Sequence, residues 1–434
     1  MKKFWQAVTT DRRIALAVMV AALGYFVDVF DLILFAILRV PSLKAIGVSG
    51  DALMSEGMYL LNMQMGGMLA GGLLWGILGD KLGRIKVLFG SILLYSIGNI
   101  GNAFVADIPQ YALCRFITGV GLAGEVGAAI TLVTEMMPKE TRGYGTMVIV
   151  VMGSLGAVVA GLIGDMMSWT NAYIVGGVMG LALLAMRVSL CESGIFRAAC
   201  AHKDLRHGDV MMILTSPARL MRYIYCILVG VPLWFVIGVL IAFAPEIGTA
   251  LGMQEVPKTI YATMIYYGSL TFGTLFCGMI SQNLGSRKRA IALFIAMGLV
   301  FSLAVLLLPL SSANLYYALC VPLGFCGGFW VVFLTMVAEQ FGANLRATAT
   351  TSAPNFVRGS IVPITLAFGA MKESLGVLNS AAILAVAVFG LSLLALARLR
   401  ESFHNDMDYV EIKGGAMTLA ELEESAAVPE GAPG

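Results

Sequence analysis

The stretch GILGDKLGRIK at residues 76–86 recurs in altered form as GMISQNLGSRK at residues 278–288, an offset of 202. A second pair of segments follows at nearly the same offset, 204: EMMPKETRG at 135–143 and EQFGANLRA at 339–347. Two matches at nearly one offset indicate an internal repeat. The chain is therefore predicted to consist of two related halves, with a site between them.

The composition is typical of an integral membrane protein. Of 434 residues, 59% are hydrophobic and only 12% are charged, about half the charged fraction of a soluble protein. A net charge of +2 gives no reason to expect nucleic acid as a partner. The seven cysteines show no Cys-x-x-Cys pair and no metal-ligand spacing, so neither a metal nor a cofactor is expected.

The apolar residues occur in blocks of about 20, the length of a helix that spans a bilayer. They predict an all-α integral membrane protein with twelve transmembrane helices in two pseudo-symmetric six-helix halves. The halves are expected at 1–190 and 223–400, with a polar, basic linker at 191–222 and an acidic, disordered tail at 401–434. The expected spans are 14–37, 57–79, 87–105, 111–137, 145–166, 171–190, 223–245, 259–281, 290–309, 314–337, 349–371 and 377–397.

Basic residues gather on one side of this twelve-span path. Because cytoplasmic loops carry the excess of Lys and Arg, both termini are expected in the cytoplasm and the protein in the cell (inner) membrane. The segment MKKFWQAVTTDRR has no small-residue cleavage site before a long first span, so it is interpreted as a cytosolic lead-in.

Two local patterns in the first half are specific enough to indicate a family. Residues 76–86 meet the loop pattern G-x-L-x-D-[RK]-x-G-R-x-[RK], and Arg115, Gly119 and Gly121 meet the fourth-span pattern R-x-x-x-G-x-G. In both, the chain resembles the major facilitator superfamily over about residues 12 to 400. The resemblance implies a secondary transporter that works by alternating access. The second copy of the loop departs from the pattern, because Gln282 replaces its acidic residue.

A finer resemblance concerns the first and fourth spans. The segment from Asp28 to Asp31 and the stretch GVGLAGEVGAAITLVTE at 119–135 are similar to proton symporters for phosphate and for organic acids. The phosphate group typically has Asp-Tyr where this chain has Glu125-Val126, and the aromatic-acid group typically has Gly where it has Val29. The resemblance therefore leaves the substrate open.

Carboxylates inside the spans are the first candidates for function, because a buried charge is costly there. Asp28 and Asp31 stand at i and i+3, on one helix face. Two such carboxylates do not both ionise easily in a poor dielectric, so we expect them to hold and release a proton. Glu125 lies ten residues beyond Arg115, about 15 Å deeper along the helix. We expect it to take part in proton coupling together with Asp28 and Asp31. The alternatives are a water-exposed pair at the outer mouth and a packing salt bridge.

Arg358, about ten residues into the eleventh span, is the most informative cation. Its counterpart at offset 204 is Ser154, so its charge is not part of the shared scaffold. A guanidinium facing a carboxylate-bearing half suits a planar anion, and the alternative is a standing ion pair with one of the carboxylates. The other candidates for substrate contact are Asn355, Arg115, Trp234 and Tyr267.

A third group of charges lies at the predicted cytoplasmic ends of the spans. Asp80 and Arg84 belong to the loop pattern, and Glu135 and Arg142 follow the fourth span. We expect these four residues to form a charge latch that opens when the site faces the cytoplasm.

The sequence thus predicts a monomeric, proton-coupled symporter of a small organic anion, with the substrate, protons and the lipid bilayer as partners. A phosphate symporter, a sugar or polyol symporter and an exporter of the same fold remain open as alternatives. A transporter-derived sensor and an intramembrane enzyme are less favoured. The chain is not expected to be an enzyme, because His202, His207 and His404 all fall in cytoplasmic segments.

Overall fold

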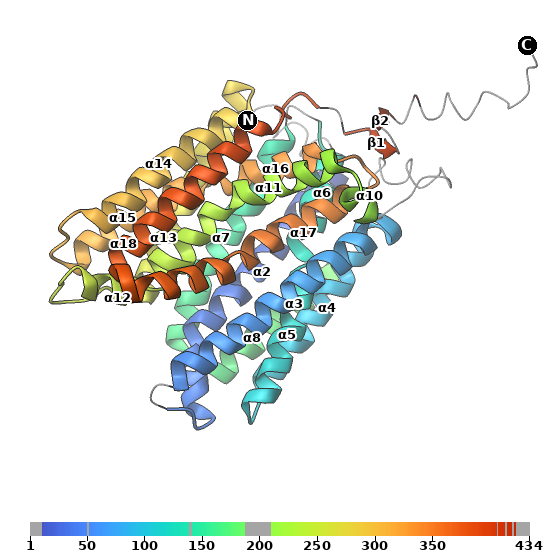
Figure 1. The fold of residues 1–434 in the computed structure, drawn as a ribbon. Helices are drawn as coiled ribbons and strands as arrows, with labels where there is room; N and C mark the ends of the chain where they lie inside the picture. The colour runs from blue at the N-terminus through green and yellow to red at the C-terminus, as the bar shows by residue number, and fades with distance from the viewer. Residues whose placement is uncertain are drawn as a thin grey trace, which may run out of the picture.

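The computed structural model describes residues 11–49, 52–138, 141–186, 210–405, 407–412, 415–418 and 421. The described chain is helical apart from loops and one β-hairpin (Figure 1). The first half comprises α2 (Arg12–Ala45), α3 (Ala52–Leu82), α4 (Arg84–Asn102), α5 (Ile108–Leu122), α6 (Glu125–Met136), α7 (Arg142–Met166) and α8 (Trp169–Met186). The second comprises α10 (Val210–Leu214), α11 (Pro217–Phe235), a π-helical stretch (Val236–Ile241), α12 (Ala244–Ala250), α13 (Thr259–Leu284), α14 (Arg287–Leu307), α15 (Ala313–Gly327), α16 (Trp330–Gln340), α17 (Arg346–Gly359) and α18 (Ile361–Arg398).

These helices agree with the expected twelve spans in two halves. Nine segments of the described residues are long and apolar enough to cross a membrane. The three other expected spans correspond to α3, α4, and α17 with the first part of α18. Within α18, Gly376 has a φ of 79°, a conformation that glycine adopts at little cost, and the chain turns there between the last two spans.

The expected boundary of the seventh span differs from the structure. Helix α11 begins at Pro217 rather than at 223, because proline suits the first turn of a helix. Residues 210–214, also within the expected linker, form the short helix α10. The rest of that linker, 191–209, lies outside the described residues.

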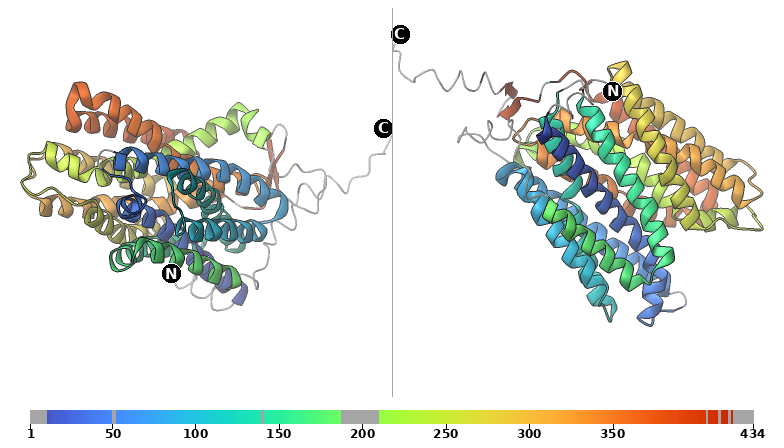
Figure 2. Two further views of the ribbon diagram at one scale, coloured as in Figure 1. Left: turned by 90° about the horizontal axis from the view of Figure 1, so that it is seen from below. Right: turned by 180° about the vertical axis from the view of Figure 1, so that it is seen from behind.

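The two halves meet along helices that are far apart in sequence. Helix α3 packs against α17, and α7 packs against α13. In Figures 1 and 2 the helices of the two halves lie close together near the β-hairpin and diverge toward the opposite end. The end at which the halves lie close together contains the two repeated loop segments and is the predicted cytoplasmic side.

Helix breaks repeat at the same sequence offset as the loop segments. The fourth span is divided between α5 and α6 around Gly124, and the tenth between α15 and α16 around Gly328. These glycines are 204 residues apart. The three-dimensional structure thus shows the internal repeat found in the sequence, within the spans as well as in the loops.

The segment after α18 is ordered in part, which differs from the disordered tail expected from residue 401. Strands β1 (Tyr409–Ile412) and β2 (Gly415–Thr418) form an antiparallel hairpin. The side chain of Asn344 donates to the carbonyl of Glu411 and accepts from its N–H group, each at 2.9 Å. These contacts and the burial of Val410 attach the hairpin to the helices, a tertiary effect that acidic composition does not reveal.

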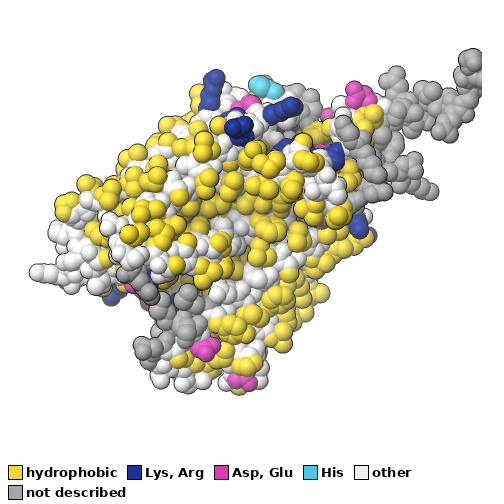
Figure 3. Space-filling model, viewed as in Figure 1, with side chains coloured by type: hydrophobic (Ala, Val, Ile, Leu, Met, Phe, Trp, Pro, Cys, Tyr) yellow, Lys and Arg dark blue, Asp and Glu magenta, His cyan; other side chains and the backbone are white. Residues whose placement is uncertain are grey.

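The surface between the two ends is largely apolar. Figure 3 shows hydrophobic side chains over the helices, with most of the visible Lys and Arg near the end that holds the hairpin. Exposed apolar side chains on spanning helices are expected to face acyl chains, because no water is present at that depth.

Candidate functional site

A small cavity lies between the two halves, at Arg358 in α17. Its volume is about 30 Å³, room for roughly one or two water molecules. The described conformation is therefore closed too tightly around this position for an organic substrate. Side chains of both halves form the wall, which consists of Tyr25, Val29, Leu32, Val150, Ser154, Leu233, Trp234, Ile237, Tyr267, Leu270, Trp330 and Arg358.

An ion pair joins the two halves beside this cavity. Arg358 Nη2 donates to Oδ2 of Asp28, on α2, at 3.2 Å. Both side chains are almost completely buried, so water does not screen the two charges. Removing one partner of such a pair is costly, because the other charge is left uncompensated. Of the two possibilities that the sequence left open for Arg358, this conformation shows the ion pair.

Arg358 also carries donors that the described part of the chain does not use. Its Nε and Nη1 are buried and have no hydrogen-bond partner among the described residues, and the same holds for Asp28 Oδ1 and Trp234 Nε1. Such groups are rare in protein interiors. Each two-pronged edge of a guanidinium pairs Nη2 with either Nε or Nη1, so a carboxylate that binds with both oxygens would use one free nitrogen together with Nη2, the nitrogen that contacts Asp28.

Aromatic rings surround Arg358. Its guanidinium carbon lies 6.0 Å from the centre of the Trp234 ring. Trp330 Nε1 donates to the hydroxyl of Tyr25 at 3.1 Å, across the two halves. Tyr267 lies in the same wall. The structure thus brings the predicted Trp234 and Tyr267 together with Arg358. It adds Tyr25 and Trp330, which sequence reasoning missed because aromatic residues in spans usually serve packing.

Asp28 and Asp31 have different neighbours, although they are one turn apart on α2. Asp31 lies against α8 inside the first half, where a Cβ on Gly176 would be 2.4 Å from its Oδ1. Asn99 on α4 and Arg115 on α5 are its polar neighbours. The structure therefore divides the expected pair. Asp28 lies at the interface between the halves and Asp31 within one half, still in electrostatic range of each other.

Arg115 belongs to this inner cluster and does not line the cavity. Its Nη2 donates to Gln64 Oε1 on α3. Its guanidinium carbon lies 4.2 Å from the centre of the Phe35 ring. In this conformation the side chain is buried among α2, α3 and α5, and the substrate contact expected for it stays a prediction.

Two further candidates lie near the break in the fourth span. Glu125 is the first residue of α6, is fully buried, and lies in electrostatic range of Asp28. Asn355 stands one turn before Arg358, and its Nδ2 donates to the carbonyl of Ala123 at 3.0 Å. Asn355 therefore connects the second half to the junction of α5 and α6, and it is not among the residues that line the cavity.

On the predicted cytoplasmic side, Asp80 holds the start of α17. Its carboxylate accepts hydrogen bonds from the N–H groups of Ala347 at 3.0 Å and Thr348 at 2.8 Å, and from the Thr348 hydroxyl at 2.7 Å. A negative charge at a helix N-terminus also interacts favourably with the helix dipole. Gln282, its counterpart in the repeat, lies beside Gly143 at the start of α7 but has no charge to contribute.

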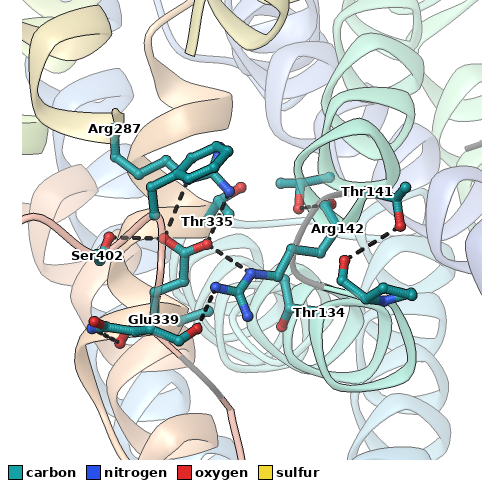
Figure 4. Close-up of polar contacts among 12 residues, drawn as sticks. Thr134, Thr141, Arg142, Arg287, Thr335, Glu339 and Ser402 are labelled. Carbon is teal, nitrogen blue, oxygen red and sulfur yellow. Dashed lines mark hydrogen bonds and ion pairs between the residues drawn. The ribbon is translucent and has the colours of Figure 1, made fainter. Parts of the chain in front are cut away.

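Two buried ion pairs also cross between the halves on this side of the molecule. Glu135 Oε1 lies 2.9 Å from Arg346 Nη1, and Arg142 Nε lies 2.7 Å from Glu339 Oε1. Figure 4 shows Glu339 between Arg142 and Arg287, with Arg287 Nη2 at 2.9 Å from Oε1. The predicted latch residues Glu135 and Arg142 thus each take a partner from the opposite half, so the contacts close this end of the molecule.

Comparison with protein families agrees with this geometry. The family model described as Major Facilitator Superfamily matches residues 14–364. The chain belongs to the Major Facilitator Superfamily.

Individual members of the superfamily align over most of this chain. The 3-(3-hydroxy-phenyl)propionate transporter of Escherichia coli (strain K12) is 26% identical over 332 residues, which cover 74% of this chain and 80% of that protein. The sialic acid transporter NanX of the same strain is 25% identical over 381 residues, 81% of this chain and 90% of that protein. The solved structure of the proton:xylose symporter XylE matches with a TM-score of 0.72 at 16% identity, over 91% of this chain and 98% of that chain. The likeness to XylE shows the superfamily fold alone.

Sequence reasoning missed three latch residues that the superfamily fold brings together: Glu339, Arg346 and Arg287. The signal for two of them was present in the repeat, because Glu339 and Arg346 stand 204 residues after Glu135 and Arg142. Arg84, predicted to join the latch, is the first residue of α4, but its side chain lies outside the described part of the structure.

Proposed function

We propose that this member of the Major Facilitator Superfamily is a proton-coupled symporter of a small organic anion. The observation that carries the proposal is the position of Arg358 together with its unused hydrogen-bond donors. It is buried between the halves at the wall of the cavity, and two of its nitrogens have no partner among the described residues. A planar carboxylate matches such a guanidinium with two parallel hydrogen bonds.

The surroundings of Arg358 favour an acid with a flat, apolar body. Trp234, Tyr267, Tyr25 and Trp330 supply aromatic faces on several sides of the cavity. Aromatic and apolar walls with a few polar groups are typical of small-molecule sites. The two curated relatives described above are named for carboxylic acids, one of them aromatic, which supports the same substrate class.

Coupling to protons follows from competition for Arg358. When the substrate carboxylate takes the guanidinium, Asp28 loses its ion-pair partner at 3.2 Å. A buried carboxylate without a counter-charge favours its protonated form, so anion and proton enter the site together. Asp31 and Glu125, both buried and in electrostatic range of Asp28, supply further positions for the proton.

Transport requires the latch to open. In the proposed cycle, Asp80 and the pairs Glu135–Arg346 and Arg142–Glu339 hold the predicted cytoplasmic side closed while substrate enters from the other side. Their release lets the halves rock around the site, which exposes it to the cytoplasm of the cell bounded by the inner membrane.

Two experiments on the purified, full-length protein test the proposal. The first screens thermal stability against aromatic and aliphatic monocarboxylates, dicarboxylates, phosphate and sugars, because a ligand that binds the folded state raises its stability. The second measures uptake of each stabilising compound into proteoliposomes with and without an inward proton gradient. Stabilisation by a carboxylate and gradient-dependent uptake are expected. Stabilisation only by a sugar or by phosphate contradicts the proposed substrate class.

A further inference from the structure

A second, larger cavity lies away from the central site, where α11 and α18 meet the hairpin on the predicted cytoplasmic side. Its volume is about 670 Å³. The wall contains four arginines, Arg219, Arg222, Arg398 and Arg400, and two glutamates, Glu401 and Glu411.

Both glutamates form hydrogen bonds or ion pairs with other residues of the protein. Glu411 accepts hydrogen bonds from Arg219 Nε at 2.5 Å and Arg222 Nη2 at 2.7 Å. Glu401 accepts from the hydroxyl of Ser286 and from the N–H of Arg287 at 2.9 Å, at the start of α14. Partial burial raises the pKa of Glu401, but these hydrogen bonds outweigh it and hold the pKa below its usual value.

The arginines, in contrast, retain unused donors. Among the described residues, no ion pair or side-chain hydrogen bond involves the guanidinium of Arg398 or Arg400, and Arg222 Nε is buried without a partner. The guanidinium carbon of Arg222 lies 4.8 Å from the centre of the Phe341 ring, which fixes its position. With four arginines and two glutamates in its wall, the cavity carries a net positive charge, and the guanidinium groups of Arg398 and Arg400 are available to an anion.

The position of the cavity along the spans places it at headgroup depth. Helix α11 enters the membrane region from Pro217, and α18 leaves it at Arg398. One turn into each helix, Met221 is 42% exposed and Leu394 is 67% exposed. Met221 also lines the cavity. The opening thus continues from basic side chains onto an apolar surface that faces acyl chains.

We propose that this cavity binds the headgroup of an anionic phospholipid. The phosphodiester contacts Arg222, Arg398 and Arg400, and the acyl chains lie along Met221 and Leu394. Arginine suits a phosphate because its guanidinium binds two oxygens at once, and basic pockets at the cytoplasmic ends of spans are a recognised form of lipid site.

Native mass spectrometry of the full-length protein in neutral detergent tests the proposal. The protein is titrated with phosphatidylglycerol, with phosphatidylcholine, and with inorganic phosphate, and the thermal stability of each mixture is measured in parallel. The test variant is Arg398→Gln/Arg400→Gln, and each single substitution is made as well. The matched control is Lys81→Gln/Arg289→Gln, which removes two exposed charges from the same side outside the cavity.

The expected result is preferential binding of phosphatidylglycerol over phosphatidylcholine. The double variant is expected to weaken this binding about tenfold, the effect of losing a charged hydrogen bond, and the control to leave it unchanged. Equal binding of both lipids, or an equal loss in test and control variants, overturns the proposal. If inorganic phosphate abolishes lipid binding and raises the stability as much as the lipid does, the cavity is a site for a free anion, and the proposal is overturned too. If the double variant is not monodisperse, the single substitutions decide.

Discussion

Arg358 and Asp28 lie 330 residues apart in sequence and form a 3.2 Å ion pair across the two halves of the molecule. The pair stands beside the small central cavity, and Arg358 has two further nitrogens without partners among the described residues. The same guanidinium is therefore the natural contact for Asp28 and for an anionic substrate. In the proposed mechanism, this competition links substrate binding, proton uptake and the approach of the halves.

Proton coupling is tested by removing the charge of each carboxylate of α2. Asp31→Asn keeps the shape of the side chain but cannot ionise, so we expect loss of proton-driven accumulation while exchange of internal for external substrate continues. Uptake and exchange in proteoliposomes measure the two activities separately. Asp107→Asn, which alters an exposed helix cap, serves as the control. Full accumulation by Asp31→Asn and Asp28→Asn after a pH step would show that these carboxylates are structural.

Asp28→Asn has a second expected effect. Arg358 is then buried without a counter-charge, which typically costs about 3–5 kcal/mol, so the melting temperature should fall. A substrate carboxylate supplies the missing charge, and we expect it to stabilise the variant more than the wild type. Differential scanning fluorimetry with and without substrate measures both effects. Equal stabilisation of the two proteins would mean that the substrate carboxylate does not contact Arg358.

The latch is tested at Glu339, which binds Arg142 and Arg287. Glu339→Gln leaves two buried arginines without a carboxylate. We therefore expect the equilibrium between closed and open conformations of the predicted cytoplasmic side to shift toward the open one by about 1–3 kcal/mol. A cysteine placed at Ala347, which is buried against Gly79 of the other half in the closed form, should then react faster with a maleimide reagent. Glu255→Gln, an exposed change outside the latch, is the control. Unchanged labelling of the Glu339→Gln variant would mean that the ion pairs do not hold this side closed.

Close packing between the halves predicts a similar effect without any change of charge. A Cβ on Gly127 would lie 2.2 Å from Thr351 Oγ1 and 2.3 Å from its Cα, so Gly127→Ala cannot be accommodated while α6 and α17 stay in contact. The variant should favour separation of the halves on the latch side. Gly268→Ala, with nothing within 4 Å of the added carbon, should behave as wild type. Distances between spin labels on the two halves report the shift, and identical distributions in both variants would contradict it.

The repeat made much of the architecture predictable from sequence, because related halves must place Glu135 and Glu339, or Arg142 and Arg346, in equivalent positions. The division of Asp28 from Asp31 was not predictable. Spacing at i and i+3 places both on one face, but the neighbours of each depend on how α2 packs against α8 and α17. The hairpin was missed for a related reason: its order depends on tertiary contacts such as that between Asn344 and Glu411.

The most direct test of the account is the affinity of Arg358 variants for a carboxylate substrate, measured by calorimetry on folded, monodisperse protein. Arg358→Lys keeps the charge but loses the two-pronged geometry, so it should weaken binding by roughly 1–3 kcal/mol, the scale of a charged hydrogen bond. Arg358→Gln should nearly abolish binding, whereas Arg289→Gln should leave it unchanged. An Arg358→Gln protein that binds the carboxylate as tightly as the wild type would contradict the role of Arg358, and with it the organic anion as substrate.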